Sequence, residues 1–197
     1  IWIIKEKIMK TVCTFIWLFC IVIYAQSVHA YSYATAGKDA LIEAREAVLK
    51  AVNEKEFDIA LSTVSQYDEG FRYLDEHHHP GLLKELNTAI NNKEGNRVFQ
   101  VLNQFMVAEI QRRLNAAESE FTNYQIARVL VLKSKKVYDL ISVGLSSQQR
   151  LEGEQLLKKC LHAVGKPGVF GVGSVPPDLK IFKNSKIKLF ELLSELK

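Results

Sequence analysis

The sequence predicts an all-α protein in which about seven antiparallel helices form a helical bundle or a short αα-hairpin array. Apolar residues recur with the three-to-four-residue spacing of helix faces, and no segment shows convincing strand-like alternation. A six-residue motif occurs twice, each time between two expected helices. The composition, 48% hydrophobic and 24% charged, excludes a disordered or multi-span membrane protein.

The first thirty residues have the pattern of a cleaved signal peptide, assigned to positions 1–30. A mostly apolar run at positions 11–24 follows a basic stretch that contains Lys5, Lys7 and Lys10. Val28 and Ala30 then supply the small residues that a signal peptidase requires. We expect translation to start at Met9 and cleavage to follow Ala30, which favours a periplasmic or secreted protein.

Two alternatives to cleavage are a retained membrane anchor and a lipoprotein. A helix of the 14 residues at positions 11–24 spans about 21 Å, less than the roughly 30 Å of a hydrocarbon core. A lipoprotein would carry its lipid on Cys20, but the bulky Phe19 precedes that cysteine, where the processing enzyme favours a small residue. Removal of the segment is therefore the favoured interpretation.

Cleavage would leave residues 31–197 as a single all-helical domain. Cys160 would be its one cysteine, so no intramolecular disulfide could form, and we expect an inert core thiol. Three lysines and one glutamate leave with the segment, which lowers the formal net charge from +4 to about +2. That balance argues against a nucleic-acid partner, and membrane contact is expected only through the signal peptide.

The first three helices are predicted from apolar faces separated by turn signals. The first covers positions 39–52, with an inward face of Leu41, Ala44, Val48 and Val52. The second runs from position 57 to the His-Pro pair at 79–80. Pro80 suits the first position of a short third helix that ends at positions 91–92.

Four more helices complete the prediction. A long fourth helix has apolar residues from position 98 to 117, and a fifth covers 124–141. Ser147 suits the N-cap of a sixth helix that ends at Gly165. The Gly- and Pro-rich segment 165–177 then predicts an irregular loop, and a seventh helix opens at Pro177 and Asp178.

The repeated motif reads AVNEKE at positions 51–56 and AINNKE at positions 89–94, an offset of 38 residues. Spacings of this size are typical of helical-hairpin repeats. The stretch from Glu56 to Val64, with Ala60 and Leu61 after Phe57, resembles the first helix of a tetratricopeptide-type unit, and this resemblance implies antiparallel αα-hairpins. A closed bundle is favoured over a short solenoid.

The feature that looks most chemical is a run of carboxylates and imidazoles, which are transition-metal ligands, at Asp75, Glu76, His77, His78 and His79. Glu76 and His79 have the i, i+3 spacing used in di-iron bundles, but the sequence offers no second pair. One hypothesis is a zinc or copper site. The other is a solvated helix end, where protonated imidazoles interact favourably with the terminal carbonyl groups.

The Gly- and Pro-rich loop is the second candidate site. Its residues Lys166, Val169, Phe170 and Val172 are expected either to dock a partner or to cover one end of the helical domain. The glycine spacing does not match a dinucleotide-binding motif. Two lysine clusters read as solvated faces or as docking patches for an acidic partner, namely Lys133, Lys135 and Lys136, and Lys180, Lys183, Lys186 and Lys188.

These observations favour an exported binding or scaffold protein, an accessory subunit of an extracytoplasmic assembly. It would act through a protein partner or through self-association, and no catalytic residues are expected. The alternative is a periplasmic metal-handling protein that uses the run from Asp75 to His79. No cofactor is evident apart from that transition metal.

Overall fold

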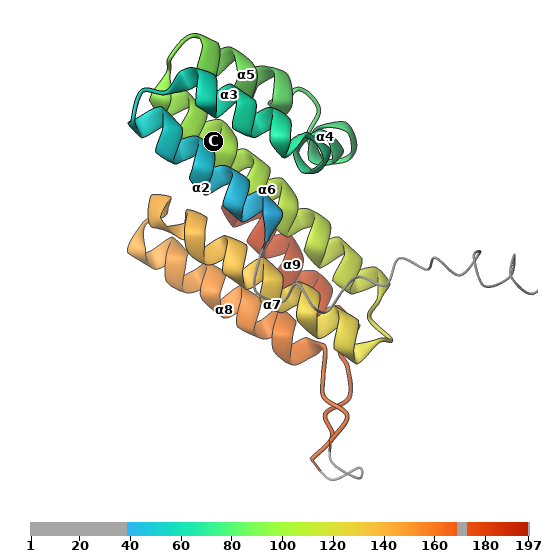
Figure 1. Cartoon of the computed structure of the whole chain (residues 1–197). Helices are drawn as coiled ribbons and strands as arrows, with labels where there is room; N and C mark the ends of the chain where they lie inside the picture. Colours follow the sequence, from blue (N-terminus) through green and yellow to red (C-terminus); the bar gives the residue numbers. More distant parts are fainter. Residues whose placement is uncertain (1–38, 169–172, 197) are drawn as a thin grey trace, which may run out of the picture. The chain divides into compact units, whose positions relative to one another are not determined.

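The computed structural model describes residues 39–168 and 173–196 (Figure 1). Eight α-helices run through this part of the chain: α2 (Ala40–Asn53), α3 (Phe57–Gln66), α4 (Asp68–His77), α5 (Leu82–Asn91), α6 (Gly95–Ser119), α7 (Tyr124–Ile141), α8 (Ser147–Ala163) and α9 (Leu179–Leu193). A short 3-10 helix, η2 (Ser142–Gly144), follows α7. The predicted all-α class is confirmed for these residues. The expected signal peptide lies outside them.

The segment predicted as one second helix contains two. The chain turns at Tyr67, between α3 and α4, and α4 leaves in a different direction (Figure 1). Asp68 and Glu69 occupy the first turn of α4, where negative charge stabilises a helix N-terminus. The buried residues Val64 of α3 and Phe71 of α4 are seven residues apart, which is the spacing of one helix face. Periodicity alone therefore predicts a continuous helix across the break.

The predicted helix starts are off by one or two residues at three places. Pro80 does not open the third predicted helix, because Gly81 adopts a left-handed conformation with φ of 100° and α5 begins after it. Ser146, one residue before the predicted N-cap, caps α8 through a reciprocal pair of hydrogen bonds with Gln149. Asp178 is the N-cap of α9 and not its first residue.

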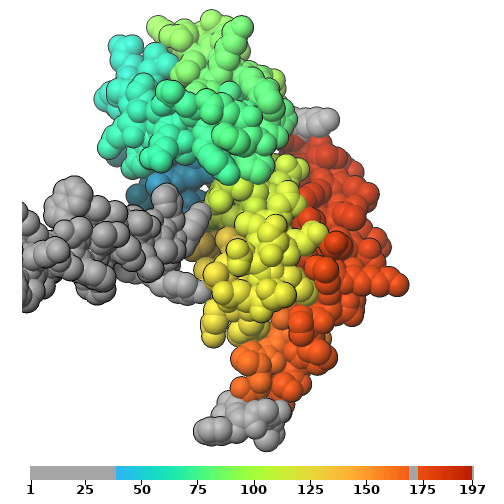
Figure 2. Space-filling model, turned by 90° about the vertical axis from the view of Figure 1, so that its right-hand side faces the viewer, coloured from blue at the N-terminus to red at the C-terminus, as the bar shows by residue number. Residues whose placement is uncertain are grey.

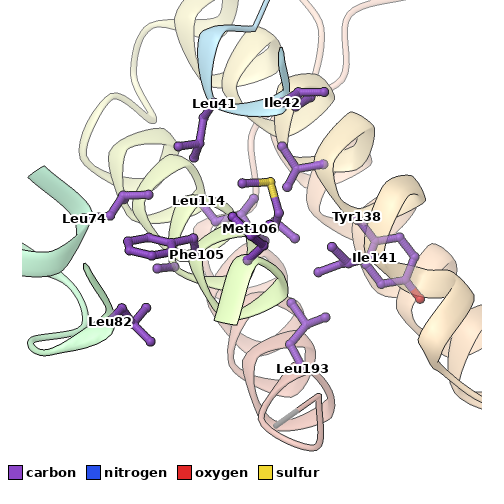
Figure 3. Close-up of a cluster of buried hydrophobic side chains, with 14 of the residues drawn as sticks. Leu41, Ile42, Leu74, Leu82, Phe105, Met106, Leu114, Tyr138, Ile141 and Leu193 are labelled. Carbon is purple, nitrogen blue, oxygen red and sulfur yellow. The ribbon is translucent and has the colours of Figure 1, made fainter. Parts of the chain in front are cut away.

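The long helix α6 is the element around which five of the other helices pack. It contacts α2, α4, α5, α7 and α9, and 12 of its 25 residues are buried. Figure 3 shows apolar side chains from those neighbouring helices around Phe105, Met106 and Leu114 of α6. Phe105 also meets the ring of Phe71 edge to face, with 4.9 Å between the centroids. The core is therefore continuous along the length of α6.

The two copies of the repeated motif adopt the same turn. Lys55 and Lys93 have left-handed φ values of 62° and 61°. Glu56 N donates to Ala51 O at 2.8 Å, and Glu94 N donates to the equivalent alanine carbonyl at 2.9 Å. Burial repeats at the same offset of 38 residues in five pairs: Ala44 and Leu82, Val48 and Leu86, Val52 and Ile90, Ala60 and Val98, Val64 and Leu102. The sequence repeat is thus a repeat of local structure.

Tyr138 fastens α7 to α8. Its side chain is fully buried, and its hydroxyl donates to Arg150 O at 2.9 Å. Burial, with smaller contributions from nearby charges, raises the pKa of Tyr138 to about 12. The ring fits because residue 153 is glycine, since a Cβ there would lie 2.2 Å from the Tyr138 hydroxyl oxygen.

Cys160 fills a comparable place between α8 and α9. Its thiol is buried and free, and Sγ lies 3.9 Å from Phe182 O, to which it is a weak donor. Burial raises the pKa of this thiol to about 12, so the reactive thiolate form is strongly disfavoured near neutral pH. The expectation of an inert core thiol is consistent with this environment.

Replacement of Gly153 by alanine is expected to lower the free energy of unfolding by about 1–3 kcal/mol, because the methyl group must displace the Tyr138 ring. Gly70→Ala is the matched control. A Cβ at Gly70 meets only Leu41 Cδ1, at 3.8 Å, so alanine should stabilise α4 by about 0.5–1 kcal/mol. Urea unfolding followed by circular dichroism measures both, and equal effects of the two variants would contradict the packing described.

Candidate functional site

The run from Asp75 to His79 does not form one cluster. Asp75 Oδ1 accepts a hydrogen bond from Leu83 N at 2.8 Å, so this carboxylate holds the start of α5. His77 stacks on Tyr73, with 4.6 Å between the ring centroids, and its Nδ1 lies 3.0 Å from the Tyr73 carbonyl oxygen. Asp75 and His77 therefore already have partners, at the start of α5 and within α4 respectively.

The remaining members of the run point to different surroundings. Glu76 is exposed, whereas His78 is partly buried and interacts electrostatically with Arg112 and Glu109 of α6. His79 lines a groove that is described below. Within residues 39–168 and 173–196, no three His, Cys, Asp or Glu side chains lie together as metal ligands would. The metal-site hypothesis therefore rests on the sequence alone.

The Gly- and Pro-rich loop is closed at its base. Lys166 and Val175 exchange two backbone hydrogen bonds of 2.9 Å, and Asp178 N donates to Ala163 O at 2.8 Å. Gly165 has φ of 80°, and a Cβ there would lie 2.4 Å from Val175 O, so this position requires glycine. The other loop residues predicted to dock a partner, Val169, Phe170 and Val172, lie outside the described residues.

A groove of about 380 Å³ lies between α6, the start of α5 and the end of α9. It is lined by His79, Glu85, Gln104, Val107, Ala108, Gln111, Leu193, Ser194 and Leu196. The four residues from α6 follow the i, i+3, i+4, i+7 spacing of a single helix face. Figure 2 shows the side of the molecule on which α9, in red, lies beside the yellow-green surface of α6.

The groove combines apolar and polar side chains. Val107, Ala108, Leu193 and Leu196 supply apolar surface, and the two glutamines supply amide donors and acceptors. Glu85, which also lines the groove, is paired with Arg97, so its charge is already compensated. The arrangement can bury an apolar side chain of a ligand and hydrogen-bond its polar groups, which is typical of binding surfaces.

A charged network on α6 lies next to the groove. Glu109 is 5% exposed and accepts hydrogen bonds from Arg112 Nε at 2.6 Å and from Arg113 Nε at 2.5 Å. Arg113 also donates to Lys133 O at 3.0 Å, which ties α6 to α7. Burial lowers the pKa of His78, Arg112 and His77 lower it further, and Glu109 opposes them.

Part of the lysine cluster on α9 holds that helix against α6. Lys186 Nζ donates to Asn115 Oδ1 at 2.7 Å and also pairs with Glu118, and Lys183 lies 3.2 Å from the same carboxylate. The hydrogen bond from Lys186 is the largest cause of the lowered pKa of Glu118, ahead of the opposing effect of burial. These two lysines therefore hold α9 against α6.

The groove is not predicted from the sequence. The available signal was the pair Gln104 and Gln111, two amides seven residues apart on α6, but Asn96 and Asn103 have the same spacing on that helix. Two amides at that spacing share one face of a helix. Which helix covers that face depends on tertiary packing, so the position of α9 could not be read from the spacing.

Comparisons with known proteins gave no relative: no protein-family model matches the chain, and no curated protein or solved structure matches it significantly. The resemblance of the segment 56–64 to a tetratricopeptide-type helix therefore rests on those residues alone. No helix in the part of the chain that the structure describes is both long and apolar enough to cross a bilayer. What the groove binds is therefore inferred from the chemistry of its lining residues.

The stability of the protein is expected to fall as the pH drops below about 6.5, and His78 should contribute to the fall. Because its folded-state pKa is below the unfolded value, the unfolded chain binds more protons in this range, and protonation favours unfolding. His78→Asn should reduce the loss of unfolding free energy between about pH 7.5 and pH 5, as measured by urea unfolding. His162→Asn, on the exposed face of α8, is the control, and identical pH profiles for all three proteins would contradict the assignment.

Proposed function

We propose that the chain is an exported helical scaffold protein, an accessory subunit of an extracytoplasmic assembly, that holds a segment of a protein partner in the groove between α5, α6 and α9. The observation that carries the proposal is the groove itself, which is lined by apolar side chains together with amide and imidazole groups. Such a surface fits a peptide segment that presents both apolar side chains and polar groups.

The proposed occupant is an amphipathic segment. Apolar side chains of a partner would be removed from water against Val107, Leu193 and Leu196, which provides the favourable free energy. Gln104 and Gln111 can each donate and accept hydrogen bonds without carrying charge, so they suit the backbone or amide groups of a peptide. Grooves between helices recognise amphipathic helices through this combination.

The α6 side of the groove is preorganised. Five neighbouring helices hold α6, and α9 is fixed to α6 by Lys186 and its partners. Side chains on rigid elements lose little conformational entropy when a ligand binds, so more of the interaction energy appears as affinity. A scaffold role benefits from such a surface.

Export and the antiparallel arrangement are part of the same proposal. The basic stretch, the apolar run and the small residues Val28 and Ala30 support removal of residues 1–30 outside the cytosol. We interpret the helices as antiparallel hairpins that pack as a bundle and share α6. The contacts of α6 with helices both before and after it in the sequence support this interpretation.

Cross-linking from inside the groove tests the proposal. A photoreactive benzoylphenylalanine in place of Val107 in the full chain should yield one discrete protein adduct in the cell envelope. Gln111→Trp, which fills the groove from a partly buried position, should reduce that adduct at least tenfold. Gln125→Trp, at an exposed position of α7, is the matched control and should leave it unchanged.

The position of the probe supplies a second control. Leu179, the first residue of α9, is 40% exposed and lies about 21 Å along that helix from Leu193, so a benzoylphenylalanine there should not give the same adduct. An adduct of equal yield from both positions, or one unaffected by Gln111→Trp in a protein with unchanged helical circular dichroism, would refute the groove as the binding surface.

A further inference from the structure

The guanidinium of Arg45 is a buried charge that the packing of the helices does not explain. Arg45 lies on α2 and is only 6% exposed. Its Nη2 donates to Asn103 Oδ1 of α6 at 2.9 Å, and its Cζ is 5.6 Å from the centroid of the Phe99 ring. Both partners are neutral, so neither compensates the positive charge.

The Nε–H group of Arg45 is buried and has no acceptor among the residues that the structure describes. An unsatisfied buried donor destabilises the folded protein, and the cost is larger when the group is charged. Nε and Nη2 lie along the same edge of the planar guanidinium, the edge that receives the two oxygens of a carboxylate in side-on pairs. One half of that edge is occupied by the Asn103 oxygen, and the other half has no acceptor among the described residues.

No carboxylate within the described part of the chain forms an ion pair with Arg45. Glu46, the next residue on α2, is exposed and acts on the guanidinium only electrostatically. Burial lowers the pKa of Arg45, and Glu46 only partly opposes that effect. The buried charge thus destabilises the free protein, and an apolar side chain of similar volume would fill the same space at lower cost.

We propose that Arg45, Asn103 and Phe99 form a binding site for a small monocarboxylate. One carboxylate oxygen accepts from Arg45 Nε, and the other accepts from Nη2, which it shares with Asn103 Oδ1. A single guanidinium balances a single negative charge, so a carboxylate fits better than a phosphate dianion. Phe99 is 38% exposed, so the site adjoins the protein surface and offers an aromatic wall to the ligand.

This site is separate from the proposed groove. The groove uses Gln104, Val107, Ala108 and Gln111 of α6, whereas the carboxylate site uses Phe99 and Asn103 of the same helix. Positions 103 and 104 are about 100° apart around a helix, so they face different directions. The two proposals can therefore fail independently.

Titration of the full chain with sodium acetate tests the site, with sodium chloride at matched ionic strength as the reference. The Nε–H resonance of Arg45, assigned by its loss in Arg45→Lys, should shift and saturate in ¹H–¹⁵N spectra. At an acetate concentration ten times the dissociation constant, the midpoint of thermal unfolding should rise by about 3–6 °C. Inorganic phosphate should produce a smaller shift at the same concentration.

Arg45→Met and Arg128→Met separate a specific site from a general salt effect. Arg128 is the matched control because its guanidinium lies over an aromatic ring in the same way, 6.0 Å from the Tyr124 centroid. Arg128→Met should respond to acetate as the unaltered protein does, and Arg45→Met should not respond. A linear, unsaturated shift of the Arg45 resonance, or an equal acetate effect in both variants, would overturn the proposal.

Discussion

Burial of α6 on several sides at once is the constraint on which the rest of the structure depends. A helix of 25 residues with 12 buried positions cannot be covered by one neighbour, and α2, α4, α5, α7 and α9 all contribute to its cover. Phe105, Met106 and Leu114 lie at the centre of this arrangement (Figure 3). The buried ions Glu109 and Arg113 satisfy each other within α6, which lets a charged pair lie in an apolar setting.

Both proposed sites occur where polar residues interrupt the apolar surface of α6. Gln104 and Gln111 face the groove beside α9, and Asn103 meets the guanidinium of Arg45 from α2. A polar group on a mostly buried helix costs free energy unless it finds a partner. Asn103 finds that partner in Arg45, whereas Gln104 and Gln111 line the groove, where the proposed peptide segment can hydrogen-bond to them.

Sequence periodicity predicted the helical class and most helix positions, because residues such as Val98 and Ala117 repeat with the helical spacing wherever a face is buried. It placed the fifth helix at 124–141, as the structure has it, but missed the break at Tyr67, because the apolar pattern stays in phase across it. Pro80 disfavours helical geometry at His79, so the sequence already argued against one shared face for Glu76 and His79, but the separate partners of Asp75 and His79 depend on side-chain directions that spacing does not give. The groove and the environment of Arg45 depend on which helices become neighbours, and spacing along the chain does not determine that.

Native-state amide hydrogen exchange tests most directly whether α6 joins its neighbours into one cooperative unit. At low denaturant, the slowest amides of α2–α5, of α6 and of α7–α9 are all expected to exchange with one common free energy, that of global unfolding. Complete exchange of either flanking group while α6 and the other group stay protected would contradict the account. In that case the groove and the Arg45 site would not rest on a shared rigid helix.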